Sequence, residues 1–205
     1  MTAITIPFIR RLGLAALLLL GSGPTWASDG PREVIRSTVD AVIEVLADDS
    51  LERDQRIDRI RRLMHERFDF LTMSRSVLAR NWRDASPAQQ ERFTELFPEL
   101  LLHTYMAGLE GYTNEVVEIE DTRMKGQAKA SVATKILSGD KAIPVSYRLR
   151  ENDSEWQIYD VTVEGVSLVN NYRGSFGSIV SNDGMDGLLK TLATKVEELR
   201  RPPEG

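Results

Sequence analysis

The spacing of apolar residues changes once in this chain, near residue 114, and that change limits the folds it can adopt. Before it, apolar residues recur every three or four positions, as in amphipathic helices. Between residues 114 and 165 they alternate with polar residues, and short turns separate the runs, which predicts antiparallel strands. From residue 167 the helical spacing returns. Helices, then a run of strands, then helices predict an α+β fold.

Helices are predicted throughout residues 31–111, and the third of them has the clearest signals. Ser86 can cap it, Pro87 suits its first turn, and Gln89 completes a capping box. Gly111 is a natural end for this helix. The first helix follows Pro31, the second follows the candidate N-cap Ser50, and two more helices close the chain at 167–181 and 183–200.

Four strands are predicted, and three short turns join them into a meander. The turn pairs are Lys125–Gly126, Gly139–Asp140 and Asn152–Asp153. Connections of this length join antiparallel neighbours. The twist of such a sheet makes one face concave, so helices laid over that apolar face can leave a hollow.

The first 27 residues have the pattern of a secretory signal peptide. Arg10 and Arg11 precede the apolar run 12–20, and small residues at 25–27 suit cleavage before Ser28. The apolar run is shorter than the roughly 20 residues that a membrane-spanning helix needs. We therefore expect the chain to be exported.

Residues 28–205 are expected to form one acidic domain. The whole chain has a formal net charge of −5, and losing the two arginines of the signal leaves −7. Nucleic-acid binding and permanent adhesion to anionic lipid both need an excess of basic residues, so neither is expected. The chain has no cysteine, so it is expected to fold without disulfides in the export compartment.

No reaction is predicted from the motifs. His65 and His103 are far apart and have no carboxylate or cysteine at a ligand spacing, so no metal site is expected. The tripeptide Gly165-Val166-Ser167 lacks the second glycine of a nucleophile elbow, and no H-E-x-x-H motif or P-loop occurs. We expect His103 to be a packed or half-exposed residue rather than a catalytic base.

Asp160, Tyr147 and Tyr159 form the arrangement that most resembles a proton-transfer site. Alternation along its strand turns Asp160 away from the apolar face. Arg148 and Arg150 on the neighbouring strand offer it a cross-strand partner. A structural ion pair is therefore favoured over catalysis.

Several separated segments of the chain resemble the MlaC family, also known as toluene-tolerance proteins. The segments are Phe68–Phe70, Met73–Ser74, Val77–Leu78, Asn81–Arg83, Ser86–Pro87, Tyr147–Leu149 and Trp156–Arg173. The chain departs from the family pattern at Ala79, where glycine is expected, and this affects a turn rather than a pocket. The resemblance implies an NTF2-like (cystatin-like) core with added N-terminal helices. It also implies that the chain has no enzymatic activity, no metal and no cofactor.

The resemblance further implies a periplasmic phospholipid shuttle that maintains outer-membrane lipid asymmetry. Its implied partners are an outer-membrane lipoprotein–porin complex and an inner-membrane ABC transporter with a hexameric lipid-transfer subunit. The protein itself would act as a monomer. Two alternatives stay open: an NTF2-like enzyme acting on a hydrophobic small molecule, and a periplasmic adaptor that binds no ligand.

The lipid site is expected where the third long helix meets the concave sheet face, in a cavity of roughly 1,000 Å³ or more. Periodicity does not separate lining residues from core residues, and the resemblance favours a pocket. The expected lipid-binding residues are Trp82, Phe97, Leu101, Tyr105, Val132, Ile136, Val145, Tyr147, Val161, Val163 and Arg173. Arg173 can approach a head-group phosphate, because helix N-termini favour anions, or can instead form a structural ion pair. Tyr105 and Tyr147 need hydroxyl partners that a pocket mouth would supply.

Overall fold

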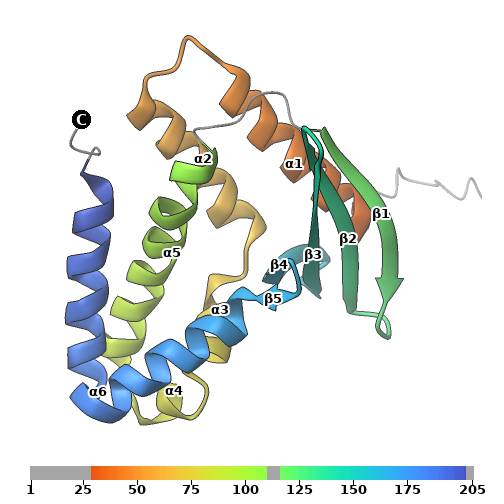
Figure 1. Cartoon of the computed structure of the whole chain (residues 1–205). Coiled ribbons are helices and arrows are strands. Elements are labelled where there is room, and N and C mark those ends of the chain that lie inside the picture. The colour runs from red at the N-terminus through yellow and green to blue at the C-terminus, as the bar shows by residue number, and fades with distance from the viewer. Residues whose placement is uncertain (1–28, 110–115, 202–205) are drawn as a thin grey trace, which may run out of the picture.

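The computed structural model describes residues 29–109 and 116–201 (Figure 1). In chain order the elements are α1 (Pro31–Ala47), α2 (Arg53–Arg67), α3 (Phe70–Leu78), α4 (Arg80–Asp84), α5 (Pro87–Leu109), β1 (Val116–Met124), β2 (Lys129–Ser138), β3 (Lys141–Asn152), β4 (Glu155–Val163), β5 (Val166–Ser167) and α6 (Leu168–Arg200). The expected signal peptide and the expected helix end at residue 111 lie outside the described residues.

The strands form one antiparallel sheet in the order β1-β2-β3-β4-β5, and the α+β fold class is confirmed. The sheet has a fifth strand that the sequence did not predict, because the turn after β4 folds the chain back onto that strand. Glu164 and Gly165 both have positive φ, of 49° and 83°. Two consecutive left-handed residues make a turn that folds a chain back onto itself. Val166 and Ser167 therefore pair with the end of β4 before α6 begins.

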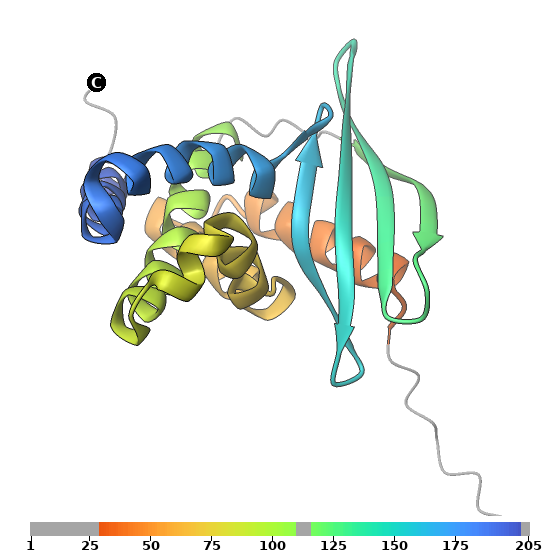
Figure 2. The same cartoon turned by 90° about the horizontal axis from the view of Figure 1, so that it is seen from below.

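One helix crosses the sheet, and the others lie on the side of β4. Figure 2 shows α1 running across the strands while the remaining helices gather beyond one side of the sheet. The main contacts agree, because α1 meets β1, β2 and β4, whereas α2, α3 and α6 meet the sheet at β4. The main contacts of α5 are with α2, α3 and α6, so α5 does not lie on the sheet face as expected.

The predicted capping box of α5 is confirmed. The Gln89 backbone N–H donates to the Ser86 hydroxyl at 3.3 Å, and the Ser86 N–H donates to the Gln89 side chain at 2.9 Å. The predicted Ser50 cap of α2 is wrong. Glu52 is the N-cap and forms its own capping box with Gln55, while Ser50 donates to the Asp48 carboxylate. Glu52 has the three-residue spacing to Gln55 that a capping box needs, so it caps α2 in place of Ser50.

Helices α3 and α4 meet at Ala79, the position where the family resemblance predicted glycine. Ala79 has φ 51° and ψ −116°, a conformation that glycine adopts far more easily than alanine. We expect Ala79→Gly to raise the free energy of unfolding by about 1 kcal/mol, because it removes backbone strain. Urea unfolding measures the change, with Ala88→Gly in the first turns of α5 as the control that should destabilise. No gain at Ala79 would contradict the strain.

The two predicted closing helices appear as one bent helix, α6. Gly184 interrupts it with φ 72° and ψ −178°, a backbone conformation that is essentially restricted to glycine. Because of this bend, the two halves of α6 pack against different elements. The first half leaves the sheet beside β5, and the second half runs alongside α5 (Figure 1).

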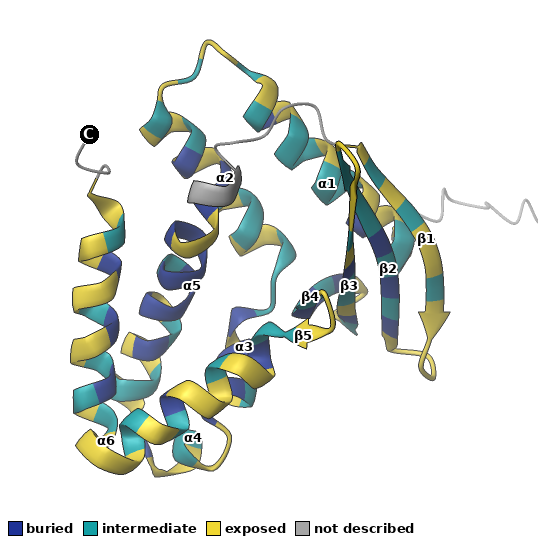
Figure 3. Cartoon of the chain, in the orientation of Figure 1, coloured by how far each residue is buried: buried dark blue, intermediate teal, exposed yellow. Residues whose placement is uncertain are grey.

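Within residues 29–109 and 116–201, buried apolar side chains form three clusters, and Figure 3 shows burial on both the helices and the sheet. The helical cluster joins α3, α5 and α6 and is centred on Phe93, Phe97 and Phe176. The sheet-face cluster joins α1 to the inner sides of β2, β3 and β4. A third cluster joins α1, α2 and the end of α5. The helical cluster and the sheet-face cluster are the two larger ones, so these buried apolar side chains do not form a single core.

Candidate functional site

Six of the expected lipid-binding residues lie on one face of the sheet. They are Val132, Ile136, Val145, Tyr147, Val161 and Val163, and all belong to the sheet-face cluster or pack against it. The strand register explains this, because Val132 pairs with Tyr147 and Tyr147 pairs with Val161. Val34 and Ile35 of α1 cover the same face. The sequence therefore predicted correctly which strand residues lie together.

Tyr147 lies half-buried on this face, close to the buried Thr134. Burial raises the pKa of its hydroxyl, and a hydrogen bond with the Thr134 side chain opposes that rise. The Thr134 hydroxyl in turn donates to the Val145 carbonyl at 3.2 Å. The partner of the Tyr147 hydroxyl is thus a neighbouring strand residue, where the sequence predicted a pocket mouth.

The two expected residues in the middle of α5 belong to the helical cluster. Phe97 has no exposed surface and Leu101 is 4% exposed. The Phe97 ring contacts Phe93, Tyr172 and Phe176, with ring centroids 5.5 to 6.1 Å apart. Because α5 packs on other helices, these side chains contribute to helix packing rather than to the sheet face. They lie in a different cluster from the six strand residues.

Tyr105 and Trp82 also lie on the helical side. Tyr105 is 41% exposed, so it is not the buried tyrosine that the sequence suggested. It hydrogen-bonds with Tyr172, and burial together with this neighbour raises the pKa of Tyr172 to about 12. Trp82 on α4 packs against the helical cluster, and the Arg75 guanidinium lies 5.7 Å from its ring centroid.

Arg173 joins α6 to α3. Its Nε donates to the Ser76 carbonyl at 2.8 Å, near the end of α3 where helical carbonyls lack partners. This contact is a hydrogen bond to the backbone, where the sequence had suggested an ion pair as the structural alternative. A role of Arg173 in lipid binding remains a prediction.

Asp160 occupies the position beside the start of α6 where an anion was expected. Its carboxylate accepts hydrogen bonds from the Ser167 hydroxyl at 2.8 Å and the Val169 N–H at 3.2 Å. Arg148 lies 3.6 Å away, which confirms the expected ion pair. Ser167 caps the Asn170 N–H at 3.1 Å. The chain's own side chains therefore satisfy two of the N–H groups that would favour a phosphate here.

Phe68 was not predicted as a site residue, yet it packs against both the helical cluster and the sheet-face cluster. Its backbone forms a bridge with Ile158, and the Asp69 N–H donates to the Ile158 carbonyl at 2.8 Å. Asp69 also caps α3 and lies 3.5 Å from Arg150, which therefore does not pair with Asp160. The signal was present in Phe68–Phe70, the first segment that resembles the family.

Two surface hollows are lined by described residues. One of about 350 Å³ lies between α1 and β1, and another of about 320 Å³ lies between α5 and the last part of α6. Neither reaches the roughly 1,000 Å³ expected for a whole phospholipid. That larger space stays a prediction.

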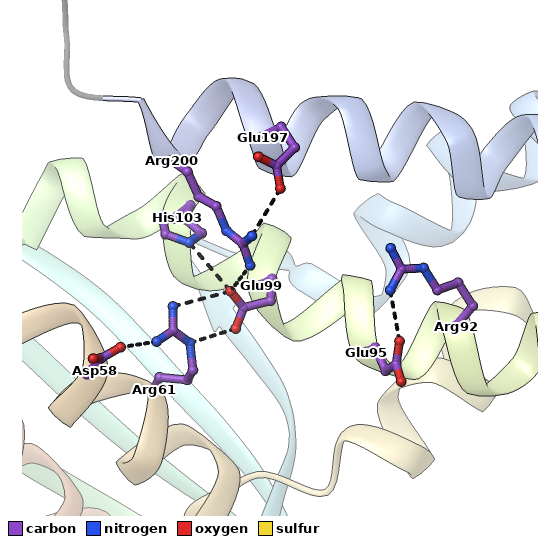
Figure 4. A network of polar contacts seen from close by, with 8 residues as sticks. All are labelled: Asp58, Arg61, Arg92, Glu95, Glu99, His103, Glu197 and Arg200. Atoms are coloured by element: carbon purple, nitrogen blue, oxygen red, sulfur yellow. Dashed lines mark hydrogen bonds and ion pairs between the residues drawn. The ribbon is translucent and has the colours of Figure 1, made fainter. Parts of the chain in front are cut away.

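Glu99 is the centre of a charged network that joins three helices (Figure 4). It accepts hydrogen bonds from Arg61 of α2 at 2.7 Å and from Arg200 of α6 at 2.8 Å. Its carboxylate also lies 3.5 Å from Nε2 of His103, which is 7% exposed and is packed as expected. Burial raises the pKa of Glu99, but the two arginines outweigh it and lower the pKa overall. The network fastens the end of α6 to α5 and α2.

The network predicts a loss of stability in mild acid. Burial lowers the pKa of His103 below its ordinary value of 6.5, and Arg200 and Arg61 add to this effect against Glu99. The folded chain therefore favours neutral His103, while the unfolded chain takes up a proton below pH 6.5. This contribution to the free energy of unfolding is complete above pH 6.5 and falls as the pH drops toward the folded-state pKa. Glu99 adds a similar loss below its ordinary value of 4.5.

Urea unfolding between about pH 5 and 7.5 checks this prediction, because the slope with pH reports the difference in bound protons. We expect His103→Gln to flatten the slope. His65→Gln, at an exposed position outside the network, should leave it unchanged. Equal slopes for the wild type and His103→Gln would contradict the role given to His103.

Across residues 29–109 and 116–201, no group of three or more histidine, aspartate or glutamate side chains is arranged to hold a metal ion. None of the helices in those same ranges combines the length and the apolar character needed to cross a bilayer.

Comparisons with known proteins give consistent matches. The toluene tolerance protein ttg2D of Pseudomonas putida is 28% identical over 193 residues, which are 90% of this chain and 88% of that protein. The intermembrane phospholipid transport system binding protein MlaC of Haemophilus influenzae is 26% identical over 132 residues, which are 62% of this chain and 60% of that protein.

A solved structure shares the fold. It is a phospholipid-binding protein from Ralstonia solanacearum in complex with a phospholipid, with a TM-score of 0.77 and 22% sequence identity. The match covers 84% of this chain and 100% of the other. A sequence model of one family, described as MlaC protein, matches residues 36–194. Because this match covers most of the chain, the protein belongs to the MlaC family.

Proposed function

We propose that the chain binds and transports phospholipid, with the acyl chains held against the inner face of the sheet. The observation that carries this proposal is the sheet-face cluster, an apolar surface that three strands share and that a single helix, α1, crosses. Family membership and the phospholipid named for the R. solanacearum and H. influenzae proteins support it. No residue of this site is assigned a catalytic role.

The acyl chains would lie along the six strand residues and reach toward Phe68. Four strands about 4.8 Å apart span about 15 Å from β1 to β4, which suits a large part of an extended acyl chain. Phe68 contacts both main clusters, so it marks the place where they adjoin. A small separation of α1 or of the helical cluster from the sheet would enlarge the space there without disturbing either cluster internally.

Energetics favour a carrier that exchanges lipid with membranes. Burying about thirty methylenes from water would gain roughly 25 kcal/mol, at ~0.8 kcal/mol for each. That exceeds the practical limit of about −20 kcal/mol for non-covalent binding, so water is not the relevant reference. Transfer from a bilayer to an apolar protein face is nearly balanced. Partner docking can then decide when the chains enter and leave.

Family membership supports a proposal for the wider role. A cleaved signal in residues 1–27 would export residues 28–205 to the periplasm as a single lipid-binding domain. There the chain would act as a monomeric shuttle between an outer-membrane lipoprotein–porin complex and an inner-membrane ABC transporter with its hexameric subunit. Its effect would be to maintain the lipid asymmetry of the outer membrane. It would use no metal or cofactor and catalyse no reaction.

Native mass spectrometry of the purified chain, followed by solvent extraction, tests phospholipid binding. We expect an added mass that extraction removes and identifies as one or two phospholipid molecules. A chain that stays free of lipid after incubation with phospholipid vesicles would refute the proposal. Detergent-stripped protein re-exposed to vesicles shows whether binding is reversible, as a shuttle requires.

A further inference from the structure

The hollow between α1 and β1 is lined by apolar residues and by charges of both signs. Its volume is about 350 Å³. The residues that matter here are Arg32, Arg36, Val39 and Asp40 of α1 with Val117 and Ile119 of β1. Positions 32, 36 and 40 are one helical turn apart, so they share one side of α1. Val34 and Ile35 point into the sheet-face cluster instead.

Two arginines supply the cationic part of the lining. Nη2 of Arg32 donates to the Ile119 carbonyl at 2.9 Å, which holds this side chain over the hollow. Arg36 pairs with Glu33 at 3.4 Å, and both side chains are about half exposed, so this pair is weak. A guanidinium has five N–H donors, so each arginine keeps donors for a phosphate.

The Asp40 carboxylate supplies the anionic part, one helical turn after Arg36. The side chain of Glu118 lies on the opposite face of β1, beside Lys135. Among the described residues, no lysine or arginine nitrogen lies within 4 Å of the Asp40 carboxylate. Asp40 is exposed, so it can meet a cation from solution. A wholly anionic ligand would have to approach this carboxylate without compensation.

The hollow adjoins the candidate lipid site. Val39 and Ile119 line the hollow and also pack against the sheet-face cluster. A volume near 350 Å³ is at the lower end for ligand pockets, so it suits a head group and glycerol rather than acyl chains. Chains leaving this hollow would run directly along the inner face of the strands.

We infer that this hollow binds the head group of a zwitterionic phospholipid bearing a primary ammonium. The phosphate lies at Arg32 and Arg36, and the ammonium lies at Asp40. This inference rests on the proposed phospholipid binding and deepens it, because it names the head-group class. The arrangement favours a phosphoethanolamine head group over phosphoglycerol, which carries the same phosphate but no cation.

The test offers delipidated full chain to vesicles with equal amounts of phosphatidylethanolamine and phosphatidylglycerol, then measures the captured lipids by mass spectrometry. We expect the wild type to enrich phosphatidylethanolamine about two- to fivefold, the range of one partly exposed charge pair. Asp40→Asn should return the ratio toward that of the vesicles while total capture persists. Arg36→Gln should lower capture of both lipids by a similar factor, since both carry phosphate.

Matched controls lie in the other hollow. Arg92 and Glu95 form an exposed pair there at 2.9 Å, so Arg92→Gln and Glu95→Gln remove similar charges far from α1. Neither should change capture or the lipid ratio. Glycerophosphoethanolamine, which has the head group without acyl chains, should not compete at concentrations equal to the lipid.

The possible results distinguish the head-group assignment from the proposed phospholipid binding. If the wild type captures both lipids equally and Asp40→Asn changes nothing, the head-group assignment is overturned and phospholipid binding stands. If the wild type captures no lipid, both fail. Competition by glycerophosphoethanolamine as strong as that of the lipid would show a site for free phosphate compounds and overturn the lipid head-group assignment.

Discussion

Replacing Phe97 with alanine is expected to lower the free energy of unfolding by about 3 to 5 kcal/mol while the folded chain still captures phospholipid. Phe97 has no exposed surface and contacts three aromatic rings of the helical cluster. Truncation would therefore leave a cavity that surrounding helices cannot easily fill. Because Phe97 is not part of the sheet-face cluster, the candidate lipid surface would stay intact.

Urea unfolding measures the stability change, and native mass spectrometry measures lipid carried per folded molecule. Phe97→Leu serves as the control, because it removes the ring but keeps most of the apolar volume, and should cost much less. A Phe97→Ala chain that remains folded but loses its lipid would contradict the division between the two clusters. It would also support the original expectation that Phe97 contacts the lipid.

Replacing Val145 with glutamate is expected to abolish phospholipid capture. Val145 is 5% exposed and lies in the centre of the sheet-face cluster. A carboxylate there would have no cationic partner on an apolar face, and an unpaired buried charge costs several kcal/mol. The bound acyl chains would meet the same carboxylate, so the substitution should lower both stability and lipid capture.

Val196 offers a matched control for Val145. It is 2% exposed and belongs to the helical cluster on α6. Val196→Glu should destabilise the chain by a similar amount and leave the capture of lipid by folded molecules unchanged. Val145→Thr and Val196→Thr repeat the comparison with a hydroxyl in place of a charge, which keeps the test valid if both glutamate variants fail to fold. Equal lipid loss at both positions would refute a site on the sheet face.

The strand part of the candidate site could be predicted because alternation is a local property. Once apolar residues occupy every second position, the pleat puts them on one side and hairpin turns align them with their neighbours. Val132, Tyr147 and Val161 therefore appear side by side as expected. They are buried beneath α1 because the first helix also has an apolar side, which is again a local property of the sequence.

The helical part could not be predicted in the same way. The apolar stripe of α5 shows that the helix is buried but does not specify which element buries it. In the structure α5 packs on α2, α3 and α6, so Phe97 and Leu101 belong to the helical cluster and not to the sheet face on which the sequence placed them. Phe68 was not predicted as a site residue, because a side chain that contacts two clusters produces no periodic pattern in the sequence.

The polar contacts also divide into those that the sequence could predict and those that it could not. The Ser86–Gln89 box was predictable, because its members are three residues apart. Asp160 was expected to pair across the strands, but its burial and its bonds to the start of α6 depend on how the turn at Glu164–Gly165 folds. Glu99, Arg61 and Arg200 come from three different helices, and no sequence spacing brings them together.

The sequence by itself determined the fold class, the order of the four main strands, the capping box of α5 and the strand face, since these depend on backbone conformation and on neighbours a few residues away. Only the tertiary structure decided that α1 rather than α5 crosses the sheet, that apolar side chains divide into separate clusters, and that charges gather beside α1 and around Glu99. The physical reason is that an apolar stripe gains free energy against any complementary surface. Which surface it meets is settled by the packing of the whole chain.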